Sequence, residues 1–307
     1  MKLAALDLGS NSFHLLVAEG LPNGTLRKVG SGKDVLRLGS VVEEHGELTP
    51  EAFDRALASA SRLRALASEL GATRLSAVAT SALRDARNGR TFLEACRRQL
   101  GLDVALLSGD DEAYLAYRGA QSAHPGSPGR TLVADVGGGS LELAAGHADR
   151  CEVVATLPLG YLRLTSQLSK SGTAGFRELA AHVRMECEKF RFLLGRCDTL
   201  LLSGGTARAV GQLLKSSSQE QLSPAVCALV ARMTPRELTA CGVDERRVDT
   251  LGAGAAVLAG LLSAFEAHQV YVSSGGLREG VIQRELERLA GVHHWSASSK
   301  MRFCFAV

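Results

Sequence analysis

Two short stretches of the sequence each end an apolar run with an aspartate and then continue with glycine and small polar residues. They read ALDLGSNSFHLL, which contains Asp7, and VADVGGGSLEL, which contains Asp135. Glycine lets the backbone adopt positive φ, so that several N–H groups converge on one anion, and serine hydroxyls add further donors. This composition is typical of phosphate-binding turns, although a plain hairpin turn that uses glycine for geometry alone is the alternative. The residues predicted to bind phosphate are Gly9, Ser10, Asn11, Ser12, Gly137, Gly138, Gly139 and Ser140.

The two stretches correspond to each other along their length. Asp7 aligns with Asp135 at an offset of 128 residues (135 minus 7), and at this offset the first glycines of the two turns also coincide. The motif is therefore predicted to be duplicated, with two related domains that face one cleft. A chance match is the alternative, because apolar hairpins share the same turn residues.

Asp7, Asp135 and Glu142 are candidate magnesium ligands. Both aspartates follow apolar runs, where an unpaired charge would be costly. Magnesium typically uses one or two carboxylates beside a phosphate chain and keeps several waters, so it would give each charge a partner. Glu142 is the third candidate, from the second stretch. The alternative is that each aspartate accepts hydrogen bonds from N–H groups of its own turn.

Two glycine pairs later in the chain each follow a short apolar run and precede a helical pattern. In LLLSGGTARAV the pair is Gly204 and Gly205, and in YVSSGGLREG it is Gly275 and Gly276. Because helix N-termini offer free N–H groups to anions, Gly204 and Gly205 are further predicted phosphate ligands. Close packing of a strand against a helix is the alternative reason for glycine at both places.

Alternating strands and helices must position these turns. Residues 50–70 carry apolar side chains at helical spacing, with Thr49 as a predicted N-cap. Shorter patterns follow in an order that is typical of sheets covered by helices. They predict strands at 74–80 and 103–109 and helices at 89–101 and 110–123. The segment 124–130, rich in proline and glycine, is the predicted linker, which gives domains at 1–122 and 123–287.

Composition argues against several classes of partner. The 307 residues are 46% hydrophobic, which suffices for two hydrophobic cores. Thirty-five basic and 32 acidic residues leave a formal charge of +3, so neither nucleic acid nor a membrane is a predicted partner. Seven scattered cysteines without a C-x-x-C pair indicate free thiols and a cytoplasmic location. The sequence shows no signal segment and no apolar stretch that approaches the length of a membrane span.

Six motifs in a fixed order resemble those of the exopolyphosphatase / guanosine pentaphosphatase (Ppx/GppA) phosphatases. They are DLGSNSFHLLVAE, SGDDEAYLAY, VADVGGGSLEL, LPLGYLRLT, SGGTARAV and VSSGGLREGVI. That family belongs to the superfamily of sugar kinases, actin and heat-shock chaperone ATPases. The resemblance implies an α/β fold of two ribonuclease H-like (actin-like ATPase) domains with an interdomain active-site cleft. It also implies that residues 288–307 return to the first domain, and it leads us to expect no C-terminal HD-like domain of the kind that longer relatives carry.

The resemblance implies roles for further residues. Glu112 occupies the position of the glutamate that is thought to activate water in this family. Its neighbours Asp110 and Asp111 are expected to raise its pKa by like charge, although capping of the following helix is the alternative role for these acids. Arg84 matches an arginine near the phosphate path and is expected to bind phosphate, and Arg37 is a weaker candidate.

The implied activity is the magnesium-dependent release of terminal phosphate from inorganic polyphosphate, guanosine pentaphosphate or both, by a homodimer. The near-neutral charge and the expected lack of an HD-like domain favour short polyphosphate chains or a nucleotide. Two alternatives stay open, a kinase or ATPase of the same fold and a non-catalytic protein that binds polyphosphate or an alarmone. His14, which aligns with Glu142, is expected to pack or to form hydrogen bonds rather than to bind metal.

Overall fold

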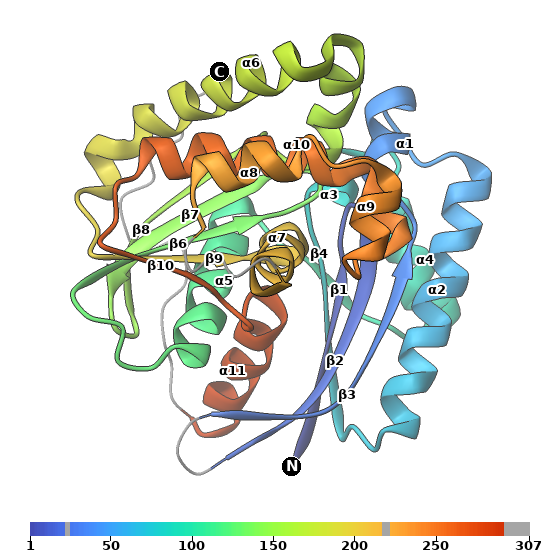
Figure 1. Ribbon diagram of the computed structural model, residues 1–307. Helices are drawn as coiled ribbons and strands as arrows, with labels where there is room; N and C mark the ends of the chain where they lie inside the picture. Colours follow the sequence, from blue (N-terminus) through green and yellow to red (C-terminus); the bar gives the residue numbers. More distant parts are fainter. Residues whose placement is uncertain (22–24, 217–221, 292–307) are drawn as a thin grey trace.

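The computed structural model describes residues 1–21, 25–216 and 222–291 of the chain. Within these residues the chain forms two five-stranded sheets, and helices lie on both faces of each sheet (Figure 1). The alternation of strands and helices predicted from the sequence is thus confirmed as a mixed α/β architecture.

The first sheet is formed by the N-terminal part of the chain. Its strand order is β3-β2-β1-β4-β5, with β1 antiparallel to β2 and parallel to β4. The strands are β1 (Lys2–Leu8), β2 (Ser12–Gly20), β3 (Leu26–Val35), β4 (Arg74–Ala79) and β5 (Val104–Leu106). The helices are α1 (Leu38–His45), α2 (Pro50–Glu69), α3 (Ser81–Asp85) and α4 (Gly89–Leu100). The central strand β1 is buried at most positions because elements pack on both of its faces.

The second sheet repeats the first. Its order is β10-β9-β6-β7-β8, which is the order of the first sheet read from the opposite edge, with β6 in the place of β1. The strands are β6 (Arg130–Val136), β7 (Leu141–His147), β8 (Arg150–Leu157), β9 (Thr199–Ser203) and β10 (Gln269–Val272). Asp7 lies opposite His14 in the first hairpin, and Asp135 lies opposite Glu142 in the second. This shared register confirms the duplication predicted from the two aspartate stretches.

Four shorter helices and one long helix belong to the second sheet's part of the chain. They are α6 (Tyr161–Leu194), α7 (Gly204–Ser216), α8 (Pro224–Val230), α9 (Pro235–Ala240) and α10 (Glu245–Ala264). In Figure 1, α6 and α10 lie along each other beyond the second sheet. By length and composition α10 would suffice to cross a membrane, which the sequence reading missed, but 67% of its apolar window is buried inside the fold. It is therefore a core helix of the second half.

Two helices between the sheets join the halves. They are α5 (Gly109–Ala123), which packs on β6, β7 and β8, and α11 (Leu277–Leu289), which packs on β1 and β2. Each helix thus covers the sheet of the other half, and the two pack against each other (Figure 1). Their crossing is close, because a Cβ on Gly280 would overlap the carbonyl oxygen of Leu115 and one on Gly119 would overlap that of Gly276. Glycine is therefore required at this crossing.

The packing of α5 and α11 differs from the division into halves that the sequence suggested. The element that returns to the first sheet begins at Leu277, earlier than the residues 288–307 that the sequence suggested. Residues 292–307 themselves lie outside the described part. Division at residues 1–122 and 123–287 stays a prediction, since α5 belongs to the first range but packs on the second sheet.

Local sequence signals place several of these elements as expected. The Thr49 hydroxyl caps α2 by accepting a hydrogen bond from the N–H of Ala52 at 3.3 Å. The hydroxyl of Ser108 likewise accepts from the N–H of Asp111 at 3.1 Å, and so begins α5 just before Glu112. The six cysteines within the described residues are free, as predicted.

Candidate active site

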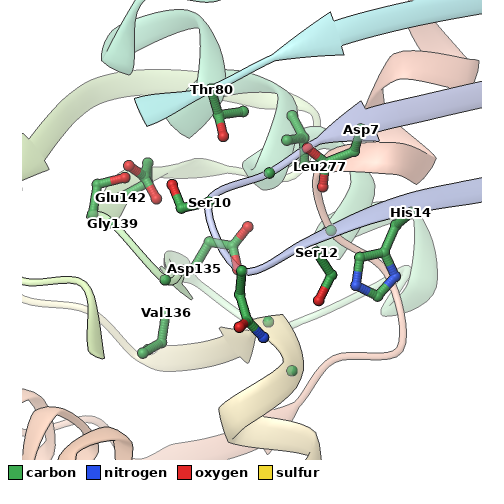
Figure 2. Close-up of a pocket in the computed structure, with 18 of the residues that line it drawn as sticks. Asp7, Ser10, Ser12, His14, Thr80, Asp135, Val136, Gly139, Glu142 and Leu277 are labelled. Atoms are coloured by element: carbon green, nitrogen blue, oxygen red, sulfur yellow. The ribbon is translucent and has the colours of Figure 1, made fainter. Parts of the chain in front are cut away.

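The turns of the two hairpins meet at the cleft between the sheets. A cavity there is lined by residues of both turns, by the starts of α7 and α11, and by Glu112 of α5. The Ser10 hydroxyl lies 2.8 Å from that of Ser81, and a Cβ on Gly139 would lie 2.8 Å from the Ser10 hydroxyl oxygen. Figure 2 shows Ser10 beside Gly139, with the carboxylates of Asp135 and Glu142 close by. Glycine at 139 is what permits this contact.

The second turn is held from behind by the start of α6. The N–H of Tyr161 donates to the carbonyl of Gly137 at 3.2 Å, and the N–H of Leu162 donates to that of Gly138 at 2.9 Å. The third carbonyl, of Gly139, accepts from Nε of Arg163 at 2.8 Å. In a trans peptide the N–H points opposite to the carbonyl. The N–H groups of this turn are therefore directed away from α6, as a phosphate-binding turn requires.

The first turn is held in the same way by the segment that leads into α1. The carbonyl of Asn11 accepts from the N–H groups of Leu36 and Arg37, both at 2.9 Å, and that of Ser10 accepts from the N–H of Gly39 at 2.8 Å. Arg37 has a left-handed backbone with φ of 53°. Its side chain donates to the carbonyl of Arg246 at 3.2 Å and does not line the cavity.

Four carboxyl groups surround the cavity, Glu112 and Glu142 buried and Asp7 and Asp135 partly buried, and removal from water raises the pKa of each. The pKa of Asp7 rises to about 7 and that of Glu112 to about 8, and both shifts are caused mainly by removal of the charged form from water. The pKa of Asp135 and that of Glu142 are also raised, again by burial first. For Glu112 the next contributions are the opposing charge of Arg84 and the like charges of Asp7 and Asp135.

The cause of the raised Glu112 pKa differs from the sequence expectation. We expected Asp110 and Asp111 to raise it, but burial and the two aspartates of the hairpins do so instead. Asp111 accepts a hydrogen bond from the Ser108 hydroxyl at 2.7 Å and so takes part in the cap of α5. The helix-capping alternative is therefore correct for Asp111.

Several buried polar atoms at the site lack a hydrogen-bond partner within the described part of the chain. They are Asp7 Oδ1, Asn11 Oδ1, Ser12 Oγ and Glu142 Oε1. Such atoms are costly unless something binds them, and oxygen donors of this kind suit a hard cation beside an anion. Among the described residues no group of three or more His, Cys, Asp or Glu side chains is arranged to hold a metal. A magnesium ion here would need water and phosphate oxygens to complete its coordination.

Arg84 lies beside the predicted base. Its Nη1 donates to the carbonyl of Leu107 at 2.9 Å and reaches Oε2 of Glu112 at 3.4 Å. It is not among the residues that line the cavity. A phosphate contact for Arg84 therefore stays a prediction, whereas its contact with Glu112 is a feature of the structure.

Gly204 and Gly205 line the cavity, and so does Gly276 of the pair after β10, whereas Gly275 packs against the backbone of Gly119 in α5. Gly204 has φ of 94°, and a Cβ there would lie 2.8 Å from Oδ1 of Asp135. A Cβ on Gly205 would overlap the guanidinium group of Arg247. Gly204 thus requires glycine, both for its positive φ and because its Cβ would also lie 2.6 Å from the Val136 carbonyl oxygen, whereas at Gly205 the Arg247 side chain could move aside.

Three arginines that line the cavity were missed by sequence reasoning. Arg208 lies in α7, Arg247 at the start of α10 and Arg278 at the start of α11. Within the residues described, no hydrogen bond or ion pair binds the guanidinium of Arg208, and burial lowers its pKa. Arg278 donates from Nη1 to Nδ1 of His14 at 3.0 Å, so His14 forms a hydrogen bond as expected. For two of these arginines the sequence contained a signal, because Arg208 and Arg278 each follow a glycine pair closely, whereas Arg247 does not.

His14 is neutral at this position. Burial first, and then the nearby positive charges of Arg278 and Lys33, lower its pKa to about 2. Because guanidinium groups only donate, Nδ1 of His14 must be the acceptor in the bond to Arg278. This neutral ring stands where the second hairpin carries Glu142, so only the second half places a carboxyl group at this position of the hairpin.

Two sheets of the same strand order, with a glycine-containing hairpin turn from each at one cleft, agree with the duplicated α/β fold that the family resemblance implied. A chain from Cytophaga hutchinsonii with this fold is called an exopolyphosphatase; it is 23% identical, with a TM-score of 0.81 over 95% of this chain and 99% of that one. A crystal structure of the Aquifex aeolicus Ppx/GppA family member is 26% identical, with a TM-score of 0.79 over 96% of this chain and 99% of that one.

The family itself follows from the sequence match. The Ppx/GppA phosphatase family matches residues 17–289, and the chain belongs to this family. A relative from Mycobacterium tuberculosis, called exopolyphosphatase 1, is 30% identical over 309 residues, which cover 94% of this chain and 89% of the relative. A Vibrio campbellii protein called guanosine-5'-triphosphate,3'-diphosphate pyrophosphatase is 25% identical over 93% of this chain and 59% of its own length. The resemblance seen in the six motifs is thereby confirmed.

Proposed function

We propose that this protein is a magnesium-dependent phosphohydrolase that releases the terminal phosphate from inorganic polyphosphate, from guanosine pentaphosphate or from both. The observation that carries the proposal is a buried glutamate, Glu112, at a cleft whose opposite sides are two phosphate-type turns. The printed names of the Mycobacterium and Vibrio relatives support phosphoanhydride bonds as the class that is cleaved.

In this proposal Glu112 is the general base. Its carboxylate accepts a proton from water, the water oxygen attacks the terminal phosphorus, and the bond from that phosphorus to the bridging oxygen breaks. A pKa raised toward 8 makes the carboxylate a stronger base than an exposed glutamate. Arg84, 3.4 Å from Glu112, orients the carboxylate and favours its charged form.

The turns would bind the terminal phosphate through N–H groups that the structure already orients. Preorganised donors of this kind supply much of the catalysis in phosphoryl transfer, because they cost no reorganisation during the reaction. Asp7, Asp135 and Glu142 are the residues that would hold magnesium, since Asp7 and Glu142 each keep an unpartnered buried oxygen. Magnesium would neutralise charge on the phosphate oxygens.

Arg208, Arg247 and Arg278 support a substrate with more than one phosphate. They bring three positive charges to a cavity whose turns would bind one phosphate. Guanidinium groups bind phosphate through two parallel hydrogen bonds, and Arg208 is free to do so. The formal charge of only +3 for the whole chain makes a long polyphosphate a weaker ligand than a short one. Short polyphosphates and guanosine pentaphosphate are therefore the proposed substrates.

The test is phosphate release by the purified protein with magnesium. Polyphosphates of several lengths, guanosine pentaphosphate and ATP should be offered in parallel. The Glu112→Gln variant removes the base, and Glu51→Gln, at an exposed position of α2, is the matched control. Release from none of these substrates would overturn the proposal, and release from ATP alone would favour the kinase or ATPase alternative.

Two further parts of the proposal concern the oligomeric state of the protein and its location in the cell. A homodimer would elute and scatter light at about twice the 32.3 kDa of one chain. A cytoplasmic location is consistent with six free cysteines among the described residues. Thiol titration of the folded and unfolded protein from the native source would check this.

A further inference from the structure

Arg163 joins the second phosphate turn to the other half of the molecule. It is the third residue of α6, and its Nε donates to the carbonyl of Gly139 at 2.8 Å. Its Nη1 donates to Glu43 of α1 at 3.1 Å, and its Nη2 forms an ion pair with Asp85 of α3. One planar guanidinium therefore binds three acceptors, of which one belongs to the second half and two belong to the first.

The bond to Gly139 differs from those of its neighbours. The carbonyls of Gly137 and Gly138 accept from backbone N–H groups of α6, which are fixed by the helix itself. The carbonyl of Gly139 accepts from a side chain, so its orientation depends on where that side chain is held. The peptide between Gly139 and Ser140 also packs against Gly160, where a Cβ would lie 2.2 Å from the Gly139 carbonyl carbon, but the Arg163 side chain supplies the hydrogen bond to its carbonyl.

The two carboxylates hold that side chain in position. A long arginine side chain has many rotamers, and an ion pair to Glu43 and another to Asp85 select the one that reaches Gly139. Both acids lie on helices of the first half, α1 and α3, and α1 also packs against α6 of the second half. If the halves separate, the guanidinium loses both partners and the Gly139 carbonyl loses a fixed donor.

We propose that Arg163 is a positioning residue that orients the Gly139–Ser140 peptide for phosphate only while the two halves are closed on each other. Closure of the cleft and assembly of the second phosphate turn are then one coupled event. This inference rests on the proposed function in one respect, namely that the second turn binds phosphate.

Arg163, Glu43 and Asp85 can be substituted with little expected effect on the stability of the fold. The side chains of Arg163, Glu43 and Asp85 are 31%, 51% and 38% exposed, so their ion pairs contribute little to the stability of the fold. A second cavity behind the turns is lined by these same three residues, and a shorter or altered side chain is accommodated there. Variants at these positions are therefore expected to fold.

The first variant is Arg163→Lys. Lysine keeps the positive charge near Glu43 and Asp85 but lacks the fork that also reaches Gly139. We expect kcat to fall about 10- to 100-fold, as is typical when a group that orients a functional residue is removed. The melting temperature should change by no more than about 2 °C. The matched control is Arg177→Lys, an exposed position of the same helix, which should leave kcat unchanged.

The second variant combines Glu43→Gln with Asp85→Asn and leaves Arg163 in place. It should lower kcat in the same direction, because the guanidinium is no longer held. When Arg163→Gln is added to it, the loss should not exceed that of Arg163→Gln alone, since the three side chains act as one unit. Full kcat in Arg163→Lys, or losses that multiply in the combined variant, would overturn the proposal.

Binding of inorganic pyrophosphate by calorimetry separates this inference from the proposed function. If no substrate is hydrolysed, the proposed function fails, but the affinity of the intact chain for pyrophosphate with magnesium still reports on the turn. Arg163→Lys should weaken that affinity by about tenfold, because the N–H of the Gly139–Ser140 peptide is no longer held in position to donate to phosphate. An affinity equal to that of the unchanged chain would show that Arg163 does not orient the turn.

Discussion

Replacing Glu112 by glutamine should slow the reaction and at the same time stabilise the protein. The rate should fall about 10²- to 10⁴-fold, because amide oxygen does not accept the proton of the attacking water and general bases contribute on this scale. The stability should rise because Glu112 is 7% exposed and glutamine resembles its uncharged form. If the only role of Glu112 were to support the fold, the same substitution would lower the stability of the protein.

The size of the stability gain follows from the pKa. The usual pKa of this side chain is 4.5, and burial raises it to about 8 in the folded protein. A pKa raised on folding means that stability is full below pH 4.5 and is lost as the pH rises toward 8. Each pKa unit corresponds to about 1.4 kcal/mol, so the loss at pH 8 is about 4 kcal/mol. Glutamine does not titrate, and the variant should keep this free energy.

The assay is thermal unfolding without divalent metal at pH 5 and at pH 8, beside phosphate release with magnesium. We expect nearly equal melting temperatures at pH 5 and a melting temperature higher by roughly 5–10 °C for Glu112→Gln at pH 8. Glu51→Gln, on an exposed face of α2, should change neither quantity. A variant that is slower but also less stable at pH 8 would refute the reasoning, because Glu112 would then support the fold through bonds that glutamine does not replace.

Three further changes test other parts of the site. Asp7→Asn should lower phosphate release about 100-fold or more and raise the magnesium concentration for half-maximal activity, measured by titration with the metal; an unchanged metal requirement would remove Asp7 from the ligand set. Arg208→Gln should raise the KM for tripolyphosphate about 10- to 100-fold with little change in kcat, since a charge-assisted hydrogen bond is worth about 1.5–3 kcal/mol. Steady-state kinetics measure both constants, and an unchanged KM would contradict a phosphate contact for Arg208. Gly280→Ala should destabilise the protein by about 3 kcal/mol in urea unfolding, because its Cβ would overlap the carbonyl oxygen of Leu115; a loss near zero would mean that α5 and α11 separate readily.

Much of the candidate site could be predicted from the sequence because the pattern of its turns is local. A turn that presents N–H groups to an anion needs glycine and small polar residues in consecutive positions, and both stretches show them around Asp7 and Asp135. The repeat of that pattern predicted the duplicated sheets, which share one strand order. Thr49 and its helix were predicted for the same reason, since a cap acts within three residues.

The sequence offered only a weak signal for the arginines of the cavity, since Arg208 and Arg278 follow glycine pairs but Arg247 follows none. Arg208, Arg247 and Arg278 lie on three different helices, and arginine is common throughout the chain. Whether a guanidinium faces the cleft or solvent depends on how α7, α10 and α11 pack, which no local pattern encodes. The same holds for the pKa of Glu112, whose cause is burial between the halves and not the acids beside it in the chain.

The sequence by itself determined which backbone segments form the two glycine-containing hairpin turns and that they are equivalent, because turn geometry depends on neighbouring residues. Only the tertiary structure decided that α5 and α11 each cover the other half's sheet, and that Arg163 joins the Gly139 carbonyl to Glu43 and Asp85. These contacts join residues far apart in the chain. They arise because the apolar faces of two sheets are buried against one shared pair of helices, and this packing brings the two turns to one cleft.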